Sequence, residues 1–269
     1  MQEVSQLFED LLQVNHHIET KIEISLVNGT VTVNEDKIMS ISTSSSAFTG
    51  DNPSVGNAVA AEIDFSIIKP DYTIPRMAKV SPWVRVVGEP DPDTGIAPAS
   101  EWIRKGTFYI DTRSYEDNGL GQTVMTVHGF DAMLRAESDF PLNCPLFDNG
   151  NSTDILVTNY IAQQMGCVPD LRNEEWMIHE YTVMRPNTSS EPNKYSMRDV
   201  LRYIAAMYAG SFVISDATRT VDGVEKEQLR LIPLNCIEPE TNYLIQESTG
   251  LPITFGTMPD DDEEVRILV

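Results

Sequence analysis

Residues 21–33, which read KIEISLVNGTVTV, decide the fold of the first half of the chain. Ile22, Ile24 and Leu26 alternate with polar neighbours, which predicts a strand that buries one face. Asn28-Gly29 is a pair typical of tight hairpin turns, so residues 30–33 should return as an antiparallel strand. The stretch therefore predicts a β-hairpin with one face on a hydrophobic core.

Strand-like stretches continue after this hairpin, with no helical pattern between them. They cover residues 38–44, 58–68, 78–87, 102–111 and 122–128. Clusters of Pro, Gly, Asp and Asn separate the stretches at residues 50–53, 89–93 and 117–119. Strands spaced so closely predict antiparallel pairing in a sandwich or barrel, rather than a parallel α/β sheet.

A short amphipathic helix is expected before the hairpin, where it would cover one hydrophobic surface. Its apolar residues at helical spacing are Val4, Leu7, Phe8, Leu11 and Leu12. After Gly129 the pattern becomes helical again over residues 130–137, with Asp131 as the cap, and residues 141–150 then read as a loop.

Two more helices are expected in the second half of the chain. The first starts near residues 152–154 and ends at Gly166. The second is the clearest in the sequence, because Ser196 and Asp199 resemble a capping box. Its apolar face consists of Met197, Val200, Leu201, Ile204, Ala205 and Tyr208. Strands at residues 211–215 and 228–234 make this section α+β.

The predicted fold class is therefore α+β and β-dominated, in four segments. They are an N-terminal helix in 1–20, a β domain in 21–136, an α+β domain in 137–247 and a further β segment in 248–269. In the last segment, strand-like residues 253–256 and 265–269 flank the acidic run 260–264, which we interpret as a loop tip. Ending on a strand suggests that the chain is the front of a longer protein.

The composition excludes some classes of function. The chain has 41 acidic and 19 basic residues and a formal charge of −22, which does not supply the basic footprint of a nucleic-acid reader. The N-terminus is acidic and no apolar run approaches about 18 residues, so neither a signal peptide nor a membrane span is expected. Cys144, Cys167 and Cys236 are odd in number and far apart, which predicts free thiols.

Common catalytic motifs are missing from the sequence, including the phosphate-binding loop, the nucleophile elbow and the zinc-protease helix. The adjacent His16 and His17 would point in different directions on a helix and so would not chelate one ion. A nucleophilic arrangement of His128, Asp131 and Cys144 is conceivable, but a structural histidine is the favoured interpretation.

Two other groups suggest binding. Asp91, Asp93 and Gly95 resemble the start of a calcium loop, but the spacing of the later ligands fails, which favours a surface turn. Trp83, Trp102 and Trp176 would suit a sugar-binding platform, although Trp83 and Trp102 sit in strand patterns where packing into the core is commoner. We therefore assign no catalytic, cofactor-binding or metal-ligating residue, and expect no enzyme activity.

Three segments resemble the N-terminal region of phage tail hub proteins. They are residues 99–111 (ASEWIRKGTFYID), 127–137 (VHGFDAMLRAE) and 198–210 (RDVLRYIAAMYAG). This is the tail-associated or baseplate hub family of phages and prophages of Gram-positive bacteria, and the resemblance spans about residues 20–235. None of the three segments is a catalytic motif, so the resemblance concerns architecture.

The resemblance implies a tail-tube-like β domain, then an α+β domain, then a second tube-like domain. It also implies a homotrimer in the virion, at the tail tip or baseplate, assembled in the host cytoplasm and without stable membrane insertion. Implied neighbours are the distal tail protein, the tail tube protein, the tape measure protein and tip or receptor-binding proteins. DNA would pass only as non-specific cargo, and acidic channel walls would keep it mobile.

Two other classes of function are open at this point. A cell-wall hydrolase or peptidase would use a carboxylate pair among Glu62, Asp64, Asp111 and Glu137. A carbohydrate-binding β module would keep the β fold but carry a sugar groove in place of a ring interface, and should be a monomer.

Overall fold

The computed structural model describes residues 4–47, 55–117, 119, 121–148, 150–177, 181–233, 244–246, 252–253 and 265–266. The chain divides into two compact units, Met1–Pro233 and Leu234–Val269. Within the described residues it is a β-dominated α+β protein, with an eight-stranded antiparallel sheet and a smaller mixed sheet that carries helices.

The eight-stranded sheet contains the hairpin that the sequence predicts. Its order is β2 (Gly29–Asn34), β1 (His16–Leu26), β6 (Lys79–Gly88), β8 (Phe108–Asp117), β9 (Thr123–Phe130), β5 (Glu62–Ile68) and β3 (Ile38–Ser44), with the short β7 (Ile103–Arg104) paired to β6. β1 and β2 pair from Lys21 opposite Asn34 to Leu26 opposite Gly29. Gly29 has a φ of 133°, which suits glycine at this turn.

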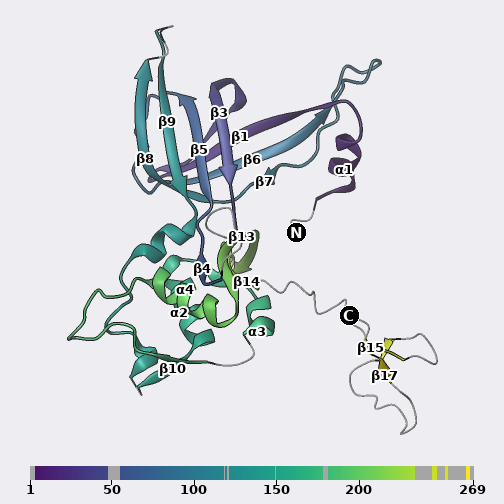
Figure 1. Cartoon of the computed structure of the whole chain (residues 1–269). Helices are drawn as coiled ribbons and strands as arrows, with labels where there is room; N and C mark the ends of the chain where they lie inside the picture. Colours follow the sequence, from purple (N-terminus) through teal and green to yellow (C-terminus); the bar gives the residue numbers. More distant parts are fainter. Residues whose placement is uncertain are drawn as a thin grey trace. The chain divides into compact units, whose positions relative to one another are not determined.

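The sheet bends over a single core. Buried Ile22 and Ile24 of β1 and Val33 of edge strand β2 belong to the same hydrophobic cluster as Phe65 of β5, and Ile41 of the opposite edge strand β3 packs against it. Figure 1 shows β1 and β6 running obliquely to β5, β8 and β9. The edge strands β2 and β3 do not pair with each other in the described residues, so the sheet is not a closed barrel.

Two of the predicted strands are each divided in the structure. Residues 58–68 form β4 (Asn57–Ala58) and β5, because β4 pairs with the mixed sheet while β5 pairs with the large one. Residues 102–111 form β7 and the start of β8, and Gly106, whose φ is 110°, interrupts the strand between them. The alternation of apolar residues in the sequence does not predict where the chain leaves one sheet for the other or where a strand is interrupted.

The N-terminal helix is confirmed as α1 (Gln6–Leu12), which Ser5 caps by accepting the N–H of Phe8. Only Leu11 of its apolar residues is buried, and it packs closely against Gly88 of β6. Leu7 and Leu12 remain 45% and 42% exposed, so the helix covers less surface than its pattern predicts.

The mixed sheet has the order β11 (Val168–Pro169), β14 (Val224–Pro233), β13 (Gly210–Val221) and β4. Packed with it are α2 (Asp154–Met165), α3 (Arg172–Trp176), α4 (Met197–Met207) and the 3₁₀ helices η2 (Ala132–Glu137) and η3 (Pro145–Phe147). A two-stranded sheet joins β10 (Asn151–Thr153) to β12 (Thr182–Met184). The sequence does not predict α3 or the strands β10, β11 and β12.

The predicted helix ends are confirmed. α4 begins with a full capping box between Ser196 and Asp199, and α2 ends at Gly166, whose φ is 81°. Val200 and Ile204 are buried, as expected from their common face. They belong to a second hydrophobic core, which α2, α4 and the mixed sheet share and which includes Ile161 and Phe212. The predicted helix at 130–137 is a 3₁₀ helix, η2, and Asp131 caps it by accepting the N–H of Met133.

The unit Leu234–Val269 contains three short strands. They are β15 (Leu244–Gln246), β16 (Pro252–Ile253) and β17 (Val265–Arg266), and both of the others pair antiparallel with β15. Of the predicted strands 253–256 and 265–269, the structure describes residues 253 and 265–266, whereas the acidic run 260–264 lies outside the described residues. The domain boundaries at residues 136 and 247 stay predictions. In the described part of the chain, no helix is long and apolar enough to cross a membrane.

Candidate functional site

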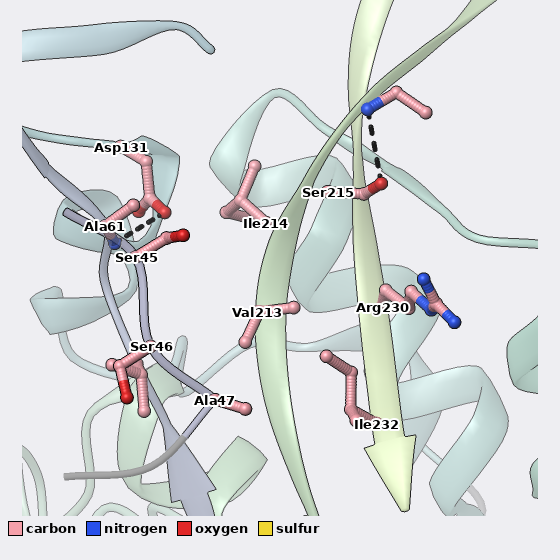
Figure 2. Close-up of a pocket in the computed structure, with 12 residues that line it drawn as sticks. Ser45, Ser46, Ala47, Ala61, Asp131, Val213, Ile214, Ser215, Arg230 and Ile232 are labelled. Atoms are coloured by element: carbon pink, nitrogen blue, oxygen red, sulfur yellow. Dashed lines mark hydrogen bonds between the residues drawn. The ribbon is translucent and has the colours of Figure 1, made fainter. Parts of the chain in front are cut away.

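A cavity of about 250 Å³ lies at the junction of the two sheets. Residues of the segments that connect the sheets line one side of it, and residues of β13 and β14 line the other. Ser45 and Ala61 line it from the segments next to β3 and β5, and Ser215 and Arg230 line it from β13 and β14. Figure 2 shows the Asp131 carboxylate beside Ala61 and Ser45, facing β13. The cavity therefore joins residues that are far apart in the sequence.

Asp131 is the central polar group of this junction and is 3% exposed. Its Oδ2 accepts the N–H of Ala61 across 2.8 Å, and its Oδ1 accepts the N–H of Met133 across 2.8 Å. Burial raises the pKa of Asp131 to about 7, and the negative charge of Glu227 adds to the rise, while the two amide hydrogen bonds and Arg198 act against it.

A second, much smaller cavity adjoins the first and has a volume of about 10 Å³. Asp131, Ala61 and Ser215 line both cavities, and Glu227 of β14 lines only the smaller one. Glu227 is 8% exposed, and its Oε1 has no hydrogen-bond partner among the described residues. The structure thus brings together two buried carboxylates that the sequence analysis did not connect.

The ionisable groups beside Asp131 and Glu227 are poor nucleophiles at neutral pH. The guanidinium of Arg135 lies over the ring of Tyr109, 4.2 Å from its centre. Burial raises the pKa of the Cys167 thiol to about 12, and that of Tyr109 also to about 12. At neutral pH both groups keep their protons, so Cys167 is a poor nucleophile.

The structure does not assemble the conceivable nucleophilic site. His128 Nδ1 lies 2.8 Å from Asp64 Oδ1, and its ring packs edge-on against Phe130. Asp131 instead binds backbone amides, and Cys144 is buried in the second core. Cys144 and Cys167 are free thiols, as predicted, while Cys236 lies outside the described residues.

The four acids considered for a hydrolase take separate roles. Asp64 pairs with His128, Asp111 Oδ1 lies 2.7 Å from Arg76 Nη2, and Glu137 pairs with Arg198. Glu62 is exposed at the start of β5. Three of the four carboxylates are therefore each paired with a basic side chain.

The calcium-like stretch forms a surface turn. Asp91 accepts the N–H groups of Asp93 and Thr94, at 2.8 and 3.0 Å, and these bonds lower the pKa of Asp91. Among the described residues, no group of three or more His, Cys, Asp and Glu side chains lies close enough to share a metal ion. His179 lies outside them, as does the acidic run 260–264.

The prediction that Trp83 and Trp102 pack into the core is wrong. Lys21 Nζ lies 5.1 Å from the ring centre of Trp83 and 5.0 Å from that of Trp102. Arg85 also lies over Trp102, and Arg104 over Trp83. Lys21 is opposite Trp83 in the β1–β6 pairing, on the face away from the buried Ile22, so this cation–aromatic row lies on the outside of the sheet.

The cations of this row cover the indole faces that a sugar would need, which disfavours the carbohydrate platform. Trp176 is elsewhere and packs against the second core. The sequence could not reveal the row, because it depends on the register of β6 against both β1 and β7.

No family model matches the chain, and no characterised protein matches its sequence.

Proposed function

We propose that this chain is a structural hub protein at the distal end of a phage or phage-like tail, where copies form a ring that continues the tail tube and anchors the tip proteins. In this proposal the bent eight-stranded sheet is the tail-tube-like domain, and the mixed sheet with its helices belongs to the α+β domain. Besides the three resembling segments, one feature of the sheet supports the proposal.

That feature is the composition of the two edge strands. β2 reads GTVTVN and β3 reads IMSISTS, without a charged residue or a proline. Interior strands of the same sheet carry charges, such as Glu19 and Lys21 in β1 and Arg113 and Glu116 in β8. Proteins usually protect the edge strands of a sheet with charged residues or prolines. In this sheet the charged residues lie on interior strands, and the edge strands have none.

Unprotected edges at both ends of one sheet suit pairing between copies. β2 pairs only with β1 and β3 only with β5 in the described residues, so each has a free side. If β2 of one copy joins β3 of the next, the contact is head-to-tail, and it generates a ring where the rotation closes. We propose three copies, with acidic residues along a central channel that lets DNA pass.

The first test is electron microscopy of the purified protein, in which a ring with a central hole is expected. Thr32→Lys on β2 and Ser42→Lys on β3 place a charge on each exposed edge. Each variant alone should abolish the ring. Thr112→Lys adds the same charge to exposed Thr112 on interior strand β8 and should leave it intact.

Mixing the two edge variants separates a head-to-tail contact from a symmetric one. Thr32→Lys keeps an intact β3 and Ser42→Lys keeps an intact β2, so an equal mixture should form one-to-one pairs and nothing larger. Rings that survive both substitutions would overturn assembly through the edges. A protein that stays monomeric at every concentration would overturn the hub proposal itself.

A further inference from the structure

Among the described residues, one of the two buried acids at the sheet junction has a carboxylate oxygen without a hydrogen-bond partner. Asp131 and Glu227 are 3% and 8% exposed and line the same cavity of about 10 Å³. Each oxygen of Asp131 receives one backbone N–H, whereas Glu227 Oε1 receives no hydrogen bond in the described part of the chain. A buried carboxylate oxygen without a partner is costly, so this geometry calls for a ligand.

The rest of the cavity wall supplies further oxygen atoms. The hydroxyl-bearing residues Thr107, Ser215 and Thr218 line it together with the two acids. Arg104 also lines it, but its guanidinium is 3.4 Å from Glu225 Oε2 and lies over the ring of Trp83. Arg104 is thus engaged by other groups, and the donors that remain are carboxylate and hydroxyl oxygens.

Because the donors on the cavity wall are hard oxygen atoms, they restrict which metal ion the cavity can bind. With neither thiolate nor imidazole on its wall, the cavity does not suit zinc or copper. A volume of about 10 Å³ holds about one water molecule, so an ion there would lose most of its own water. Magnesium sheds water reluctantly, whereas calcium accepts six to eight protein oxygens in flexible geometry.

We propose that the cavity between Asp131 and Glu227 binds one calcium ion, held by the two carboxylates and by neighbouring hydroxyl groups. The ion would link β14 to the cap of η2 and, through the Asp131–Ala61 hydrogen bond, to the segment that crosses between the sheets. Calcium would therefore stabilise the junction of the two sheets. This inference does not depend on the proposed hub function.

Calcium titration of the whole, chelator-treated chain tests the inference. Isothermal calorimetry should show one saturable site per chain above any weak uptake by surface acids. Calcium at about 100 times its Kd should raise the melting temperature by about 5–10 °C. The effect should be larger at pH 8 than at pH 5.5, because a carboxylate must lose its proton to bind the ion.

Two matched variants identify the site. Glu227→Gln keeps the shape of the side chain but removes its charge, and should abolish the saturable site. Glu116→Gln makes the same change at an exposed residue of β8 that does not line the cavity, and should leave calcium binding unchanged. If Glu227→Gln does not fold, Glu227→Asp keeps the charge but withdraws the carboxylate, and should weaken binding at least tenfold.

The same measurements can overturn the proposal. Wild-type protein without a saturable site would do so, and so would a site that survives in both Glu227 variants. Equal loss of binding in Glu116→Gln would place the ion on the protein surface instead of in the cavity, and would also count against it.

Discussion

The Asp131 carboxylate accepts the backbone N–H of Ala61 across 2.8 Å, although the two residues are 70 positions apart in the chain. Asp131 caps η2, and Ala61 lies in the short link between β4 of the mixed sheet and β5 of the large sheet. One buried side chain thus fixes the point where the backbone passes from one sheet to the other.

We expect Asp131→Ala to lower the free energy of unfolding by about 2–4 kcal/mol, because it removes a cap and leaves the half-buried N–H of Ala61 without its acceptor. Urea denaturation monitored by circular dichroism would measure the loss. Asp71→Ala, at an exposed acid, is the control and should change stability by less than about 0.5 kcal/mol. Equal effects of the two substitutions would contradict the role given to Asp131.

The raised pKa of Asp131, about 7, predicts a pH dependence of stability. Between the ordinary pKa of 3.8 and about 7, the folded protein holds a proton that the unfolded chain releases, so stability should fall as pH rises through this window. From pH 5.5 to pH 8, in EDTA, the expected loss is about 2 kcal/mol. Asp131→Asn should flatten this slope, and an unchanged slope would show that another group titrates.

Local sequence patterns predict the helix caps but not the junction. Asp131 and Met133 are two residues apart, so the cap is visible as a pattern, whereas the bond to Ala61 requires the tertiary fold. Glu225 and Glu227 lie on the same side of β14, yet one is exposed and the other buried. Their exposure differs because neighbouring elements cover only part of that face of β14. The periodicity of the strand sequence does not predict which part is covered.

Ile204 is 1% exposed on the inner face of α4, so Ile204→Asp places a charge inside the second core. We expect a loss of several kcal/mol, a large part of a domain's stability of about 5–15 kcal/mol. Tyr203→Asp changes the preceding residue, which is 63% exposed, and should cost no more than about 1.5 kcal/mol. Thermal melts of both variants would measure this, and an unchanged melting temperature for Ile204→Asp would contradict the burial.

The buried thiols should resist modification. Cys144 and Cys167 are each 1% exposed, and burial raises the pKa of Cys167 to about 12. In a Cys236→Ser variant at pH 8, Ellman's reagent should react with neither thiol in the folded protein and with both in 6 M guanidinium chloride. Rapid reaction of one thiol in the folded state would show that its core opens readily.

Charge makes ring assembly sensitive to salt. One chain carries −22, so three chains carry three times that, −66, and their repulsion opposes association at low ionic strength. The Debye length falls from about 10 Å at 0.1 M to about 3 Å at 1 M, which should weaken this repulsion while leaving the backbone hydrogen bonds of paired edges intact. Sedimentation velocity should therefore show a species of about 90 kDa, three times 30.1 kDa, that increases with sodium chloride concentration.

The Thr112→Lys variant should behave in the same way, since its edges are unchanged. Assembly that weakens as salt is added would indicate a contact held by ion pairs, and would contradict pairing through the uncharged strands β2 and β3.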